Sequence, residues 1–170
     1  KGFEITRSAG GANPGNLDAL GFAQPIDLVG ILGENADNLV IACNRINNQS
    51  VGILGLYDPT EPGAPQDYHI RITDNTIADS PIGVQLFSIG AGAGRFTARV
   101  DNNVFDNGAI FGVQATLSGL SDADLDITGN TFRNPSAFLA ATAINITNDA
   151  SIRIAGNVFE QGGQLVVVGG

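Results

Sequence analysis

An asparagine recurs along the chain between two short apolar segments, as in Ile127-Thr-Gly-Asn-Thr-Phe132. The recurring residues are Asn44, Asn75, Asn103, Asn130 and Asn157, and the intervals between them are 31, 28, 27 and 27 residues. A nearly constant period in the range of about 20 to 50 residues is typical of proteins built from stacked repeats. The chain is therefore expected to fold as a solenoid in which each repeat forms one coil.

Each repeat contains three short stretches in which apolar and polar residues alternate. One stretch ends just before the asparagine, the second begins just after it, and the third follows about ten residues later, as in Gly83-Val-Gln-Leu-Phe87. Alternation over such short segments, bounded by Gly, Asn, Asp and Ser, indicates β-strands. Helical repeats would need longer amphipathic segments, and leucine-rich repeats have a shorter period. The sequence therefore predicts an all-β solenoid of about six coils with three short strands per coil.

The asparagines are predicted to lie at the tight bend between the first and second strands of each coil. Stacked coils place equivalent side chains about 4.8 Å apart. At this spacing each side-chain amide can bond to its counterparts above and below, which satisfies the polar groups of the bend. The five residues are thus expected to form an asparagine ladder.

The order of strand, asparagine bend, strand, turn and Gly-x-hydrophobic strand resembles the right-handed parallel β-helix superfamily, the pectate-lyase-like fold, over roughly residues 39–170. The resemblance implies a right-handed parallel β-helix. Residues 1–170 are interpreted as one domain, with an irregular first coil and an insertion in 1–38 and regular coils in 39–170. Because this scaffold carries many unrelated activities, the resemblance predicts architecture rather than function.

The first coil can be aligned in two registers. In the preferred one, Phe3–Ser8 is a first strand with Ser8 at the ladder position, and Ile26–Leu32 is the third strand of that coil. The competing register places Asn16 on the ladder. A Pro-rich segment at Tyr57–Asp67 lengthens one repeat and is expected to be a surface loop.

Carbohydrate-active members of this superfamily carry catalytic or Ca²⁺-binding carboxylates on the outer face of one sheet, which we identify with the third strands. The outward positions predicted there are Leu54, Gln85, Gln114, Asn145 and Val167, and none is ionisable. A lyase needs a strong base and a glycosidase needs two carboxyl groups. The chain is therefore interpreted as a non-catalytic member without assigned catalytic, cofactor-binding or metal-binding residues, and Ca²⁺ is the one cofactor left open.

Two groups of charged residues have alternative interpretations. Asp74, Asp79, Asp101 and Asp106 lie near the bends, where Asp favours local turns, and the alternative is a Ca²⁺-binding or catalytic cluster. Arg71, Arg99, Asp126 and Arg153 are expected in one outward column on the first strands. This column is either a set of solvated salt bridges or, with Gln85, Gln114 and Asn145, a surface for an anionic polysaccharide.

The charge balance excludes some partners and favours one location. The chain has a formal net charge of −9, with eight Lys and Arg in total, so a nucleic-acid partner is not expected. It has no apolar segment long enough to insert into a membrane. The single Cys43 cannot form an internal disulfide. An acidic, turn-rich chain of this kind is expected outside the cell or on its surface.

These observations predict an extracellular structural solenoid, namely a secreted or cell-surface fibre or adhesin-like scaffold. Its apolar segment Gln164–Gly170 has no polar cap after it. Either the chain is a segment of a longer solenoid, or this end pairs with the start of another copy and the copies assemble head to tail into filaments. The alternative function is a carbohydrate-active enzyme, either a polysaccharide lyase or a glycoside hydrolase, or a polysaccharide-binding module.

Overall fold

The computed structural model describes residues 4–6, 29–89, 94–107, 111–133, 138–144, 148–160 and 164–167. These residues form seventeen strands and no helix, and every strand pairing that is present is parallel. The prediction of an all-β solenoid is confirmed.

The strands form three sheets, named here by the position of their strands in the coil. The first-strand sheet contains β3 (Leu39–Ala42), β6 (Asp67–Thr73), β9 (Arg95–Asp101), β12 (Asp122–Thr128) and β15 (Asp149–Ala155). The second-strand sheet contains β1 (Glu4–Thr6), β4 (Arg45–Asn47), β7 (Thr76–Ala78), β10 (Val104–Asp106), β13 (Thr131–Arg133) and β16 (Val158–Phe159). The third-strand sheet contains β2 (Val29–Glu34), β5 (Val51–Tyr57), β8 (Ile82–Ser88), β11 (Phe111–Ser118), β14 (Phe138–Ile144) and β17 (Gln164–Val167).

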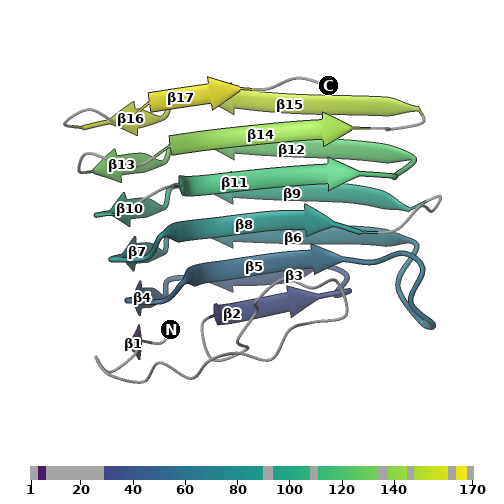
Figure 1. Ribbon diagram of the computed structural model, residues 1–170, viewed down its shortest axis with the longest axis horizontal. Coiled ribbons are helices and arrows are strands. Elements are labelled where there is room, and N and C mark those ends of the chain that lie inside the picture. The colour runs from purple at the N-terminus through teal and green to yellow at the C-terminus, as the bar shows by residue number, and fades with distance from the viewer. Residues whose placement is uncertain are drawn as a thin grey trace.

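The chain winds through these sheets in a right-handed sense. In Figure 1 the third strands cross the front from left to right, the first strands return behind them, and successive coils rise from β2 toward β17. Five coils contain all three strands, and β1 and β2 precede them. The number of complete coils is therefore slightly lower than the six expected.

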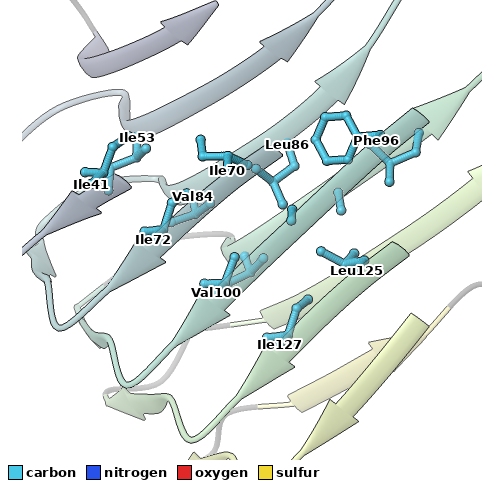
Figure 2. Packing of buried hydrophobic residues seen from close by; sticks show 14 of the residues in the cluster. Ile41, Ile53, Ile70, Ile72, Val84, Leu86, Phe96, Val100, Leu125 and Ile127 are labelled. Carbon is cyan, nitrogen blue, oxygen red and sulfur yellow. The ribbon is translucent and has the colours of Figure 1, made fainter. Parts of the chain in front are cut away.

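The core consists of inward side chains stacked in columns along the solenoid axis. In the first-strand sheet, Ile72, Val100 and Ile127 lie in register on neighbouring strands, and all three are fully buried. Figure 2 shows these side chains pointing into the interior, where Ile53 and Val84 of the third-strand sheet also point. Because each apolar residue lies on an equivalent one, the alternation in every strand buries one continuous core.

Phenylalanine rings form one such column beneath the second-strand sheet. Phe132 stacks on Phe105 with ring centroids 5.0 Å apart and on Phe159 with centroids 4.8 Å apart. A Cβ atom on Gly112 of the facing third strand would collide with the Phe132 ring, and one on Gly83 would collide with Phe105. The recurring glycine at the start of the third strand thus gives the rings the space that they occupy.

Buried tyrosines hold the Pro-rich loop against the coils. β5 ends at Tyr57 and β6 begins at Asp67, so the expected surface loop is confirmed between them, whereas Tyr57 itself is fully buried. Its hydroxyl lies 3.0 Å from the carbonyl oxygen of Pro65 and 2.8 Å from that of Gln66. The neighbouring Tyr68 ring stacks on Tyr57 at 5.4 Å. These contacts tie both ends of the loop to the core.

The predicted register of the first coil is wrong. Residues 4–6 form β1, which pairs with β4 so that Ile5 lies opposite Ile46, and the segment is therefore a second strand rather than a first. Three alternating residues fit either position, so their pairing partner alone decides the register. β2 at Val29–Glu34 takes the expected third-strand place. Ser8, Asn16 and Ile26 lie outside the described residues.

The third strand after Asn130 was also placed wrongly by the sequence pattern. Asn145 was predicted as the outward residue of this strand, but β14 spans Phe138–Ile144, and Ala140 rather than Asn145 lies opposite Gln114. The next position in the column is Val166 rather than Val167. β14 begins eight residues after Asn130, just as β11 begins eight residues after Asn103, because stacked coils need similar circumferences.

Replacing Phe132 by alanine is expected to lower the free energy of unfolding by about 3–5 kcal/mol, because the cavity would lie between two stacked rings. Urea denaturation followed by circular dichroism measures the change. The control is Val158→Ala, since Val158 is 51% exposed and its loss should cost less than about 0.5 kcal/mol. Equal stability of the Phe132 variant and the unmodified chain would contradict the packing described above.

Candidate functional site

The recurring asparagines are joined by hydrogen bonds into one continuous column. The backbone N–H of Asn44 and its side-chain Nδ2 both donate to Oδ1 of Asn75, at 2.9 and 3.0 Å. The same two bonds run from Asn75 to Asn103, from Asn103 to Asn130 and from Asn130 to Asn157, at 2.9–3.1 Å. We call these five residues the asparagine column.

The side chains of Asn75, Asn103, Asn130 and Asn157 also bind the preceding coil. Nδ2 of Asn103 donates to the carbonyl oxygen of Ile72 at 2.9 Å, and Nδ2 of Asn130 donates to that of Val100 at 2.8 Å. Both asparagines are fully buried. A buried amide without partners would cost about 1–3 kcal/mol, and these bonds remove that cost at each bend. The asparagine column therefore satisfies the backbone where the chain leaves the sheet.

The residue before each asparagine has a left-handed backbone. The φ angles are 58° at Cys43, 56° at Asp74, 57° at Asn102, 65° at Gly129 and 64° at Gly156. Gly, Asn and Asp adopt this region more readily than other residues, which explains most of the residue types at this position. Asp74 thus has a structural reason to lie at its bend.

The structure places Arg71, Arg99, Asp126 and Arg153 in one outward column of the first-strand sheet. Arg71 lies opposite Arg99, Arg99 opposite Asp126, and Asp126 opposite Arg153. The predicted residues therefore lie side by side on β6, β9, β12 and β15, which are neighbouring strands of this sheet.

Arg71 is held by a carboxylate from the next coil. Its Nε and Nη2 atoms donate to Oδ1 and Oδ2 of Asp101, at 3.0 and 2.9 Å. Thr73 donates a further bond to Oδ2 of Asp101 at 2.9 Å. The hydrogen bond from Arg71 is the main cause that holds the pKa of Asp101 below its usual range, although partial burial opposes this effect.

The other two arginines differ in their pairing. Nη1 of Arg153 lies 3.0 Å from Oδ1 and 3.3 Å from Oδ2 of Asp126. Arg99 is exposed, and among the residues that the structure describes no hydrogen-bond or ion-pair partner reaches it. The centre of the column therefore presents an unpaired guanidinium.

A groove of about 400 Å³ runs beside this column. We call it the arginine groove. The residues that line it are Arg71, Arg99, Asp101, Asn102, Asp126, Thr128, Gly129, Arg153, Ala155 and Gly156. One side thus consists of long charged side chains, and the other consists mostly of small residues at the bends.

The four aspartates singled out in the sequence are not gathered at one site. Only Asp101 lines the arginine groove. Oδ2 of Asp74 lies 3.1 Å from the Thr73 hydroxyl, whose single proton it shares with Asp101, whereas Asp79, beyond the other end of β7, accepts a bond from Asn107 at 2.6 Å. Asp106 ends β10. Within the described ranges, no group of three or more His, Cys, Asp or Glu could hold a metal ion.

The outward residues of the third-strand sheet lie apart from the arginine groove. Nε2 of Gln85 donates to Oε1 of Gln114 at 3.1 Å, so these two amides bind each other. Leu54, in register with Gln85, is only 7% exposed. Asn145 lies outside the described residues, and Ala140 takes its predicted place in the column. Gln85 and Gln114 thus do not line the arginine groove, and the part of the predicted surface that includes Asn145 stays a prediction.

Comparison with known proteins adds no relative. No protein family, curated protein or solved structure matches the chain. The described residues also contain no helix long and apolar enough to cross a membrane. The architecture and the two features above are therefore the basis for any functional assignment.

Exchanging Asp101 for asparagine is expected to lower the stability at neutral pH, with an effect that fades in acid. The folded-state pKa of Asp101 lies below its ordinary value of 3.8, so its ionised form stabilises the fold above that value. This contribution is lost as the pH falls through the lowered pKa. Unfolding measured from pH 7 to pH 2 should show the gap between the two proteins closing below about pH 4.

Two further variants test whether the Arg71–Asp101 ion pair causes this pH dependence. Arg71→Gln should reduce the same pH dependence, whereas Arg133→Gln, which removes an arginine paired with Glu160 on another sheet, should preserve it. A gap between the unmodified chain and Asp101→Asn that stays constant across this pH range would contradict the role assigned to the Arg71–Asp101 pair.

Proposed function

We propose that this chain is a structural solenoid that serves as an extracellular or cell-surface scaffold, of the fibre or adhesin-stalk kind. The observation that carries this proposal is the unbroken asparagine column, which joins five successive coils along the axis. In a solenoid each coil contacts only its neighbours, so stiffness depends on the bonds from coil to coil. A rod with buried hydrogen bonds at every bend is suited to a mechanical role.

The proposed kinship with the pectate-lyase-like superfamily rests on architecture alone. Its support is the right-handed winding, the three parallel sheets and the asparagine at the bend between first and second strands. A shared scaffold does not carry a shared activity, so this kinship supplies no substrate.

A scaffold fits the charged residues better than a catalyst does. A general acid or base works best when its pKa lies near the working pH. Asp101 is the groove carboxylate with a bidentate arginine partner, and that partner lowers its pKa. Asp126 is likewise paired with Arg153. A lyase or glycoside hydrolase would have to find its acid or base elsewhere.

The proposal includes head-to-tail assembly of copies. Within the described residues, β15, β16 and β17 at one end and β1, β2 and β3 at the other are the edge strands of their sheets. Ile152, Ile154 and Phe159 at the first of these ends are only partly buried. Edge strands with inward apolar residues are suited to pairing with another coil, and a contact between unlike ends propagates as a filament.

Electron microscopy of the purified chain over a range of concentrations tests this assembly. Regular filaments are expected, and Ile152→Lys should abolish them because it puts a charge into the core face of the end coil. Ser151→Lys is the matched control, since Ser151 is exposed on the same strand and the added charge is the same. Discrete particles at all concentrations, or equal filaments from both variants, would contradict head-to-tail assembly.

A further inference from the structure

The arginine groove contains one arginine, Arg99, that forms no hydrogen bond or ion pair with the described residues. Arg99 lies directly between Arg71 and Asp126 in the outward column. Like charges opposite one another on neighbouring strands are destabilising. Asp101 forms its ion pair with Arg71, and Asp126 forms its ion pair with Arg153, so Arg99 has no ion-pair partner of its own among the described residues, although Asp101 also attracts it electrostatically. An anion beside Arg99 would complete the pairing.

The groove is hollow where this anion would lie, because the bends change residue type along the solenoid. Asp74 and Asn102 occupy the left-handed position in two coils, whereas Gly129 and Gly156 occupy it in the next two. The adjoining residues Thr128 and Ala155 are also short. The resulting volume of about 400 Å³ is in the range of pockets that hold small ligands.

The groups around the hollow favour a ligand that carries one charge and several hydroxyls. Three arginines and two aspartates line the groove, which leaves one net positive charge. The arginines, Asn102 and Thr128 can donate hydrogen bonds, and the two aspartates can accept them from hydroxyl groups. A densely charged polyanion would meet both aspartates and a chain of net charge −9. A single carboxylate would match Arg99 without that repulsion.

An extended peptide is a poorer fit. Peptides commonly bind by adding a strand to an open sheet edge. The groove lies over β9 and β12, and both strands are already paired on each side. The groove therefore offers side chains and no free backbone edge.

We propose that the arginine groove binds a polyhydroxylated monocarboxylate, that is, a sugar acid, with its carboxylate on Arg99 and its hydroxyls on Asp101 and Asp126. A guanidinium can bind a carboxylate through two parallel hydrogen bonds, which fixes the orientation of the ligand. Such a ligand could be a free sugar acid or one unit of an acidic polysaccharide. This binding role goes beyond the scaffold function and does not depend on filament assembly.

Isothermal titration calorimetry with D-gluconate and D-glucuronate tests the proposal. Acetate supplies the charge without the hydroxyls, and sorbitol supplies the hydroxyls without the charge. Each should bind at least about tenfold more weakly than the sugar acids, since each lacks one set of contacts. Acetate that binds as tightly as both sugar acids, or sugar acids that do not bind, would overturn the proposal.

Two variants locate the site. Arg99→Gln should weaken sugar-acid binding by roughly tenfold or more, because it removes the charge-assisted pair. Arg133→Gln changes the net charge equally at an arginine outside the groove, and binding should stay within about twofold. Equal losses in both variants would show only a general charge effect and would overturn the proposal.

Gly156→Asn fills the hollow without changing the charge. Asparagine is accepted in the left-handed region, as Asn102 shows with a φ of 57°, and a Cβ at position 156 would have only the Gly129 nitrogen nearby, at 3.9 Å. This variant should fold normally and bind sugar acids several-fold more weakly. Unchanged binding would place the ligand outside the groove and contradict the proposal.

Oligomers of glucuronate distinguish the two sources of the ligand. Binding at least about tenfold tighter than that of the monomer would support a polysaccharide unit as the ligand, because further units would add contacts along the column. Equal affinity of monomer and oligomer would support a free sugar acid.

Discussion

Hydrogen bonds from each asparagine of the column to the side-chain oxygen of the next hold the bend between the first and second strands at the same place in five successive coils. At a sharp bend the backbone leaves the sheet ladder, so its N–H and C=O groups lose their sheet partners. Oδ1 of Asn103 accepts both the backbone and the side-chain N–H of Asn75, while Nδ2 of Asn103 binds the carbonyl of Ile72. One side chain thus replaces the lost bonds, and the bend can be buried.

The fixed bend determines the rest of the coil. Because the asparagines lie in register, the strands on either side of them also lie in register, and Phe105, Phe132 and Phe159 stack as one column. The same register brings Arg71 and Arg99 together on the outer face, although two like charges side by side are unfavourable. Asp101, two positions along β9 from Arg99, forms an ion pair with Arg71 and so offsets this repulsion. The arginine groove is therefore a consequence of the stacking, and the glycines at two successive bends leave it hollow.

The repeat could be predicted from the sequence because each coil carries a local signal, namely an asparagine between two apolar segments. Aligning the repeats on this asparagine also predicted the outward column that contains the arginines. The strand after Asn130 could not be placed, because most of residues 138–147 are apolar and fit more than one register, and only pairing with β11 shows that Phe138–Ile144 form the strand. The partner of Arg71 was also missed, since a long side chain can reach several neighbours and Asp101 lies one coil away and two positions along. Register and side-chain reach are tertiary properties that a single sequence does not encode locally.

Native-state hydrogen exchange, resolved by residue, tests most directly whether the asparagine column holds the coils together. If the column holds the coils together, the backbone amides of Asn75 and Asn103, which donate to the next Oδ1, exchange only when the whole domain unfolds. The amide of Asn157, which donates to no Oδ1 within the described residues, should exchange much faster. Exchange of Asn75 and Asn103 as fast as that of Asn157 would contradict the account, because the bends would then open independently of the fold.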